Sequence, residues 1–201
     1  MESVVTHPAL PVPLHWHSAP ETWTITESGA LTIVAGARTD LFIDPQTAAE
    51  ALNAPCLFGH LAGDFMLSAR VTVDFAATFD AGALVLYTHD RVWAKLCLEY
   101  SPDGTAMIVS VVTRGVSDDC NSWRVEGKYA WLRVARLGPA CAFHASADGI
   151  AWQFVRHFAL PTEEKPAIGF LAQSPTGSGC SASFDDIRYL LGRLGDLRAG
   201  V

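Results

Sequence analysis

The segment VWAKLCLEY, residues 92–100, combines ligand-binding residue types with the spacing of a β-strand. Successive side chains of a strand point to opposite faces, so Trp93, Lys95, Cys97 and Glu99 should share one face while apolar residues line the other. A Trp ring provides a flat apolar platform, and Lys and Glu provide charged hydrogen-bonding groups. The pattern indicates either part of a ligand groove or an ion pair across strands beneath an exposed Trp, with Cys97 as a small buried thiol.

Other segments could bring further polar and aromatic side chains to the same face. Alternation in ALVLYTHD, YAWLRVAR and FLAQSP sets such side chains opposite an apolar face, and SDDCNSW, residues 117–123, reads as a loop. The candidate ligand-binding residues are Tyr87, His89, Trp93, Lys95, Glu99, Asp118, Asp119, Asn121, Trp123, Trp131, Arg133 and Gln173. If their elements are neighbours, they line one concave sheet suited to a saccharide, because aromatic rings stack on sugar C–H faces and polar groups pair with hydroxyls.

Metal binding has two weaker signals. Asp118, Asp119 and Asn121 offer the hard oxygens that calcium prefers, although the same side chains can hold a turn by bonding to the backbone. Four histidines could also be considered: His15, His17, His60 and His89. A metal site needs three or four converging ligands, and the five widely spaced cysteines contain no CxxC. We therefore expect no metal or cofactor, with calcium as the one candidate ion.

Net charge and composition exclude several classes of partner. The 201 residues include 21 acidic and 14 basic side chains, for a formal net charge of −7, and 50% of the chain is hydrophobic. Nucleic acids and anionic membranes both attract basic surfaces, so neither partner is expected. No stretch approaches the roughly 20 apolar residues that span a bilayer, and no targeting segment is evident. We expect a cytoplasmic monomer or homodimer that binds a saccharide or glycoside-like small molecule.

The candidate side chains must be positioned by β-structure, because apolar runs alternate with turn residues along most of the chain. Asp-Gly pairs in SPDG (101–104) and SADG (146–149) predict two tight hairpins. The expected strands cover residues 23–26, 30–35, 65–75, 83–89, 92–100, 107–114, 123–125, 130–136, 141–146, 152–158, 167–173 and 182–190. This pattern predicts an all-β fold, an antiparallel β-sandwich.

Helical signals are few. The segment PQTAAEALNAP, residues 45–55, begins with Pro and ends at a second Pro, which predicts one short helix. The tail adds at most a second helical fragment, because Gly192 and Gly195 interrupt it. We expect a Pro-rich extension at residues 1–19, one sandwich domain at residues 20–191 and a tail at residues 192–201.

Several motifs carry a resemblance to a known family. The segments WTITESGALTIVAGARTDLF, GDFMLSARVTVDF, AGALVLYTHDRVWAKLCLEYSPDG, SVVTRGVSDDCNSW and IGFLAQSPTGSGCSASFDDI resemble the domain of unknown function 1349 family (regulation-of-enolase protein-like). That family belongs to the concanavalin-A-like lectin/glucanase superfamily, and the similarity spans about residues 20 to 190. It implies a jelly-roll sandwich with a concave sheet able to bind carbohydrate, and it implies no settled reaction.

Glycoside hydrolysis is an alternative that the resemblance raises. The jelly-roll glucanases commonly carry ExDxE on one strand, and the chain lacks it. Hydrolysis needs two carboxyl groups about 5–5.5 Å or about 6.5–9.5 Å apart, which leaves Glu99 paired with Asp118, Asp119 or Asp40 as catalytic candidates. Lys95 would keep Glu99 ionised, which suits a base or a ligand more than a proton donor.

Three functions therefore stay open. Noncatalytic carbohydrate binding, or a sugar-responsive role, by the concave sheet is favoured. The others are a glycoside-active enzyme with a non-standard carboxylate pair, and a protein-interaction module or homodimer that uses the same aromatic face.

Overall fold

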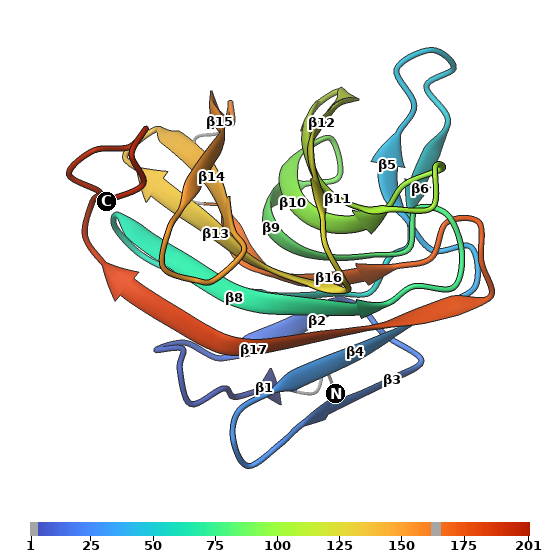
Figure 1. Cartoon of the computed structure of the whole chain (residues 1–201), viewed down its shortest axis with the longest axis horizontal. Coiled ribbons are helices and arrows are strands. Elements are labelled where there is room, and N and C mark those ends of the chain that lie inside the picture. Colours follow the sequence, from blue (N-terminus) through green and yellow to red (C-terminus); the bar gives the residue numbers. More distant parts are fainter. Residues whose placement is uncertain (1–3, 162–165) are drawn as a thin grey trace.

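The computed structural model describes residues 4–161 and 166–201, which form two antiparallel β-sheets stacked face to face and a small hairpin (Figure 1). The eight-stranded sheet has the order β1 (Val4–Val5), β2 (Leu14–Ser18), β7 (Cys56–Gly59), β16 (Ala167–Gln173), β9 (Ala81–His89), β10 (Val92–Tyr100), β11 (Ala106–Arg114) and β12 (Val116–Val125). The seven-stranded sheet has the order β15 (Gln153–Ala159), β14 (Ala140–Ser146), β13 (Tyr129–Leu137), β8 (Phe65–Asp74), β17 (Gly179–Leu191), β4 (Leu31–Gly36) and β3 (Thr22–Ile25). The hairpin pairs β5 (Leu41–Ile43) with β6 (Glu50–Leu52). The expected all-β sandwich is confirmed.

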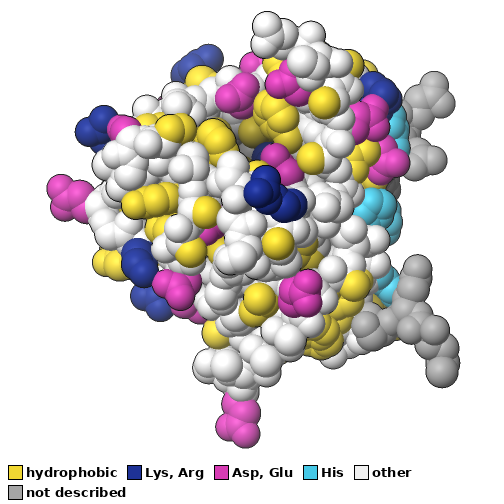
Figure 2. Space-filling view, turned by 90° about the vertical axis from the view of Figure 1, so that its right-hand side faces the viewer, with side chains coloured by type: hydrophobic (Ala, Val, Ile, Leu, Met, Phe, Trp, Pro, Cys, Tyr) yellow, Lys and Arg dark blue, Asp and Glu magenta, His cyan; other side chains and the backbone are white. Residues whose placement is uncertain are grey.

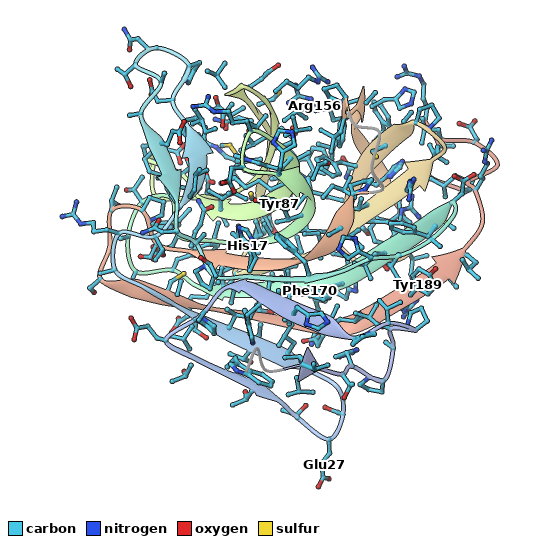
Figure 3. All side chains as sticks on the ribbon, turned by 180° about the vertical axis from the view of Figure 1, so that it is seen from behind. His17, Glu27, Tyr87, Arg156, Phe170 and Tyr189 are labelled. Carbon is cyan, nitrogen blue, oxygen red and sulfur yellow. The ribbon has the colours of Figure 1, made fainter. Side chains whose placement is uncertain are left out.

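The main core lies between the two sheets and is built by strand alternation. On β10, Ala94, Leu96 and Leu98 are fully buried and face this core. Phe170 on β16 meets Phe184 on β17 edge to face across the interface, with ring centroids 5.1 Å apart (Figure 3). Removing such apolar surface from water is the main stabilising contribution to a sandwich of this kind.

The outer face of the eight-stranded sheet carries a second buried group of side chains, here called the outer cluster. Its members include Ala81, Ala83, Val85, Trp93, Cys97, Val109, Val111 and Leu171 from the sheet, and Leu41 and Ala54 from the segment around the hairpin. The backbone N–H of Ile43 on β5 donates to Ser117 Oγ on β12 at 2.9 Å, which ties the hairpin to the sheet. In Figure 1 the hairpin stands beside the curved end of this sheet.

The prediction of a short helix at residues 45–55 is wrong. Asp44 accepts hydrogen bonds from the backbone N–H groups of Gln46 and Thr47, and Ala48 has φ of 57°, so the chain turns back after β5. Tertiary packing outweighs the local helical preference, because residues 50–52 pair with β5 and half-buried Leu52 packs against the outer cluster.

Two other local expectations are corrected. The segment Ser117–Trp123, expected as a loop, lies inside strand β12. The tail forms no helical fragment, because β17 continues to Leu191 and turns follow it. The N-terminal residues contribute β1 and β2 to the eight-stranded sheet. Within the described residues, no helix is present that could traverse a membrane.

Candidate functional site

A cavity of about 190 Å³ opens on the outer face of the eight-stranded sheet, beside β5. We call this space the sheet cavity. It is lined by Asp40, Phe42, Phe79, Lys95, Glu99, Val109, Val111, Asp119 and Gln173. In Figure 2, which faces the side of the molecule where the hairpin stands, hydrophobic side chains gather near the top of the view around acidic ones.

Strand register explains why these side chains meet. Gln173 on β16, Ala81 on β9 and Glu99 on β10 lie in one row across the sheet. Because Ala81 is small, space remains between the two longer side chains. A second row joins Lys95 on β10 to Asp119 on β12 through β11. Residues in register point to the same face of a sheet, so both rows direct polar groups into the cavity.

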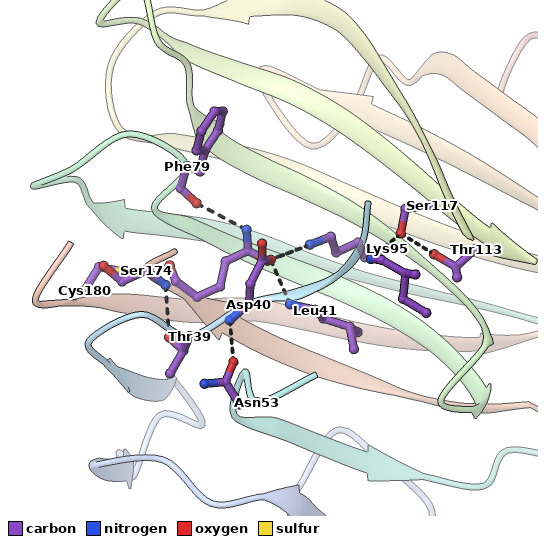
Figure 4. A network of polar contacts seen from close by, with 12 residues as sticks. Thr39, Asp40, Leu41, Asn53, Phe79, Lys95, Thr113, Ser117, Ser174 and Cys180 are labelled. Atoms are coloured by element: carbon purple, nitrogen blue, oxygen red, sulfur yellow. Dashed lines mark hydrogen bonds and ion pairs between the residues drawn. The ribbon is translucent and has the colours of Figure 1, made fainter. Parts of the chain in front are cut away.

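Lys95 is the centre of the polar network drawn in Figure 4. It is 1% exposed, and its Nζ donates to Gln173 Oε1 at 2.7 Å and to Asp40 Oδ1 at 3.3 Å. Gln173 Nε2 in turn donates to the backbone oxygen of Phe79 at 3.2 Å. Burial lowers the pKa of Lys95, but the negative charges of Asp40 and Glu99 outweigh it, so the net pKa is raised. The ammonium therefore stays charged, and two of its three donors are used by these partners.

Glu99 lacks such partners. No hydrogen bond of its carboxyl group is found among the described residues. Burial raises the pKa of Glu99 to about 7 and outweighs the lowering by Lys95, so the expectation that Lys95 keeps this group ionised is wrong; Asp40 and Asp119 raise the pKa further. Near neutral pH the group is therefore divided between its acid form, which can donate a hydrogen bond, and its carboxylate form, which only accepts.

Two aromatic side chains complete the wall and were missed from the sequence. Phe42 is half-buried on β5, and Phe79 is 38% exposed just before β9. Phe79 has φ of 69°, an uncommon conformation for a bulky residue, and its N–H donates to Tyr100 O at 2.7 Å. Phe42 is the last residue of the segment WTITESGALTIVAGARTDLF, which carries part of the family resemblance, so its position was marked in the sequence. Phe79 lies in a turn with no periodicity to mark it.

Trp93 shares a face with Lys95, Cys97 and Glu99 as expected, but the expectation that it is an exposed platform is wrong. It is 0% exposed within the outer cluster, and its Nε1 donates to Asp90 O at 3.3 Å. Cys97 is also fully buried, as expected, and burial raises the pKa of its thiol. Packing of outer-cluster side chains and the segment around β5 removes the ring from solvent.

Trp131 and Arg133 do not join this face, because their strand β13 belongs to the seven-stranded sheet. The Nε1 of Trp131 donates to Asp186 Oδ2 at 2.9 Å. Arg133 is 7% exposed beneath the C-terminal segment, where its Nη2 donates to Gly200 O at 2.8 Å. The prediction that they converge with Lys95 on one sheet is therefore wrong.

The acidic run on β12 is divided between faces. Asp119 lines the sheet cavity, whereas Asp118 pairs with Arg156 on the opposite sheet at 3.0 Å. Asn121 is exposed, and Trp123 packs against the main core. The three oxygen donors expected for calcium therefore do not lie in one loop. Among residues 4–161 and 166–201, no three His, Cys, Asp or Glu side chains are grouped to hold a metal ion.

Tyr87 and His89 lie toward the other end of β9 from Ala81. The Tyr87 ring stacks on Phe58 with centroids 5.0 Å apart and lies 4.8 Å from the ring of His17 (Figure 3). Its hydroxyl donates to Asp90, and burial raises its pKa. His89 is exposed. Of the predicted residues, the sheet cavity thus brings together Lys95, Glu99, Asp119 and Gln173, with Asp40 from the catalytic alternatives.

Two stacked antiparallel sheets define a β-sandwich protein with a fold of the jelly-roll type. More specifically, the chain belongs to the family described as Protein of unknown function (DUF1349), whose model matches residues 16–190. No match to the chain is found among the curated proteins.

Solved structures share the fold. A functionally unknown protein from Saccharomyces cerevisiae is 24% identical, with a TM-score of 0.81 over 89% of this chain and 96% of that one. The GH43 BlXynB protein from Bacillus licheniformis is 18% identical, with a TM-score of 0.68 over 89% of this chain. This chain spans only 37% of that protein's length. The carbohydrate binding module CBM66 from Bacillus subtilis is 13% identical, with a TM-score of 0.55 over 87% of this chain and 94% of that one.

Proposed function

We propose that the protein binds a saccharide without catalysis and that the sheet cavity holds one sugar ring. The observation that carries this proposal is the combination of two aromatic walls with the Lys95–Gln173–Asp40 network in one small opening. Aromatic faces pack on the C–H groups of a sugar, while fixed donors and acceptors pair with its hydroxyls. The similar folds of a carbohydrate binding module and of a GH43 protein support the proposal.

Cavity size favours a single ring. At about 190 Å³ the cavity is smaller than the roughly 300–1,000 Å³ typical of ligand pockets. A monosaccharide or the end of a chain suits such a space better than an internal stretch of polysaccharide. The interaction-module alternative, which uses the same aromatic face, loses support, because the Trp93 ring of that face is buried.

Ligand binding is tested by calorimetry and thermal shift against a panel of monosaccharides. A ligand at 100 times its Kd should stabilise the fold by about 2.7 kcal/mol. Phe79→Ala should weaken binding at least tenfold, because it removes one wall while changing a side chain that is already 38% exposed. Tyr129→Ala is the matched control, since it removes a 47% exposed ring from the other sheet and should leave binding unchanged. Binding that is absent, or equal in both variants, would contradict the proposal.

Glycoside hydrolysis is a second candidate, favoured by the raised pKa of Glu99. A carboxyl group that is still partly protonated near pH 7, with other carboxylates near it, is the arrangement of a general acid. Release of reducing sugar from oligosaccharides, lost in Glu99→Gln, would establish this reaction. Binding without product release would reject it.

A further inference from the structure

The sheet cavity carries more negative than positive charge. Four charged side chains line it, and three of them are acidic: Asp40, Glu99 and Asp119. Lys95 Nζ lies 3.3 Å from Asp40, so these two charges offset each other. Glu99 and Asp119 form no ion pair within residues 4–161 and 166–201. One to two negative charges therefore remain, depending on whether Glu99 is protonated.

Apolar walls strengthen the effect of this charge. Val109, Val111, Phe42 and Phe79 exclude water from much of the lining, and low-dielectric walls concentrate the field of nearby charges. Aromatic rings also present a negative face that attracts cations. The surplus negative charge and the aromatic faces both favour binding of a positively charged group and disfavour binding of an anion.

Hydroxyl-binding groups lie in the same cavity. Lys95 is 1% exposed and has one donor left after its bonds to Gln173 and Asp40. A buried ammonium donor aimed at an opening is costly unless a water or ligand oxygen accepts from it. The cavity thus offers a donor for a hydroxyl in addition to unpaired carboxyl groups for a cation.

We propose that the saccharide is an amino sugar, whose protonated amino group binds beside Glu99 and Asp119 while its hydroxyls pair with Lys95 and Gln173. This inference rests on the proposed function and narrows it to one ligand class. Phosphorylated sugars and uronates are disfavoured, because they would add negative charge to a cavity that already has a surplus.

A matched ligand series tests the charge directly. Calorimetry at pH 7 compares 2-amino-2-deoxyhexoses of gluco, galacto and manno configuration with their N-acetyl forms, their parent hexoses and glucuronate. N-acetylation keeps the nitrogen and removes the positive charge. We expect at least one amino sugar to bind ten times more tightly than its N-acetyl form and its parent hexose, with glucuronate weakest. Salt should weaken the amino-sugar complex selectively.

The outcomes separate the two proposals. Equal binding of a hexose and its amino sugar would overturn the amino-sugar inference and leave saccharide binding standing. No binding by any sugar in the panel would overturn both.

Neighbouring residues on β12 provide a matched pair of variants. Asp119→Asn and Asp118→Asn make the same change in net charge, but only Asp119 lines the cavity. Asp119→Asn should weaken amino-sugar binding about tenfold, a larger loss than for the parent hexose, whereas Asp118→Asn should affect neither. Equal losses in both variants would overturn the inference, because they would show a general effect of protein charge.

Discussion

The two outer faces of the sandwich are covered in different ways. On the eight-stranded sheet, the segment around β5 and β6 packs on the outer cluster and borders the sheet cavity. On the seven-stranded sheet, the C-terminal segment packs its backbone directly on two polar side chains. There Leu197 O accepts from His144 Nε2 at 2.8 Å, and Gly200 O accepts from Arg133 Nη2 at the same distance.

Each face buries a cation, and the two cations have different surroundings. Lys95 has a carboxylate partner and an amide partner beside an opening. Arg133 has the Trp152 ring 4.2 Å from its Cζ but no carboxylate partner within the described residues, and burial lowers its pKa to about 10. Its Nε and the Nδ1 of His144 have no hydrogen-bond partner in the part of the chain that the structure describes. The first arrangement has charge and space for a ligand, whereas the second is a packing contact that leaves one donor of Arg133 and one acceptor of His144 unpaired.

The largest effect is expected from the tryptophans of the two faces. Trp93→Ala should reduce the free energy of unfolding by about 4 kcal/mol, because it leaves a void in the outer cluster. Trp131→Ala should cost less, since that side chain is only half-buried. Urea unfolding measures both variants. Full stability of Trp93→Ala together with lost ligand binding would instead identify Trp93 as an exposed platform.

The next largest difference in stability between the two faces is expected when their buried cations are replaced. Lys95→Met should destabilise the protein by about 3 kcal/mol, because Asp40 and Gln173 then lose their shared partner. Arg133→Met should cost less than about 1 kcal/mol, since it also removes the burden of a buried charge without a counterion. If urea unfolding shows equal losses of unfolding free energy in the two variants, the loss in Lys95→Met does not come from leaving Asp40 without its partner.

The two faces should also respond to pH with opposite signs. Burial lowers the pKa of His144 from 6.5 to about 4, so the unfolded chain binds more protons in that window and stability falls as pH is lowered through it. Burial raises the pKa of Glu99 from 4.5 to about 7, so the folded chain holds the extra proton and stability falls as pH rises through that window.

Two variants separate the opposing contributions of His144 and Glu99 to the pH dependence of stability. In urea unfolding at several pH values from 4 to 8, His144→Gln should remove the loss on the acid side, on the order of 2 kcal/mol. Glu99→Gln should remove the loss on the neutral side and make stability rise more steeply with pH than in the wild type. Unchanged slopes in both variants would contradict these assignments.

The smallest effect is expected where the edges of the two sheets meet. The Asp118 carboxylate is 3.0 Å from Arg156 across the β12–β15 gap, and its side chain is 66% exposed. Asp118→Asn should therefore change stability by less than about 1 kcal/mol. The change should vanish in concentrated salt, and a salt-independent loss would indicate a contact other than this ion pair.

Local pattern was sufficient to predict much of the fold. Alternation in residues 92–100 correctly assigned Trp93, Lys95 and Glu99 to one face, and the SPDG and SADG turns join β10 to β11 and β14 to β15 as antiparallel neighbours. These features depend on neighbours in sequence, so single-strand geometry is enough to infer them.

The candidate site was harder to predict, because it depends on contacts between distant segments. Alternation cannot reveal that Trp93 is covered, since the covering residues include Leu41 and Ala54. It also cannot assign β13 to a sheet, and so Arg133 was grouped with Lys95 although the two lie on different sheets. Phe79 enters the cavity from a turn whose backbone conformation is set by tertiary hydrogen bonds.

The polar composition of β12 has a further consequence for how the molecule meets its neighbours. This strand ends the eight-stranded sheet, and within the described residues it pairs with β11 alone. An edge with unpaired backbone groups can recruit a strand from another molecule and start aggregation. Asp118, Asp119 and Arg124 place charge along this edge, which makes docking of a further strand unfavourable. The same polar residues that made this segment read as a loop therefore protect the edge of the sheet from pairing with a strand of another molecule.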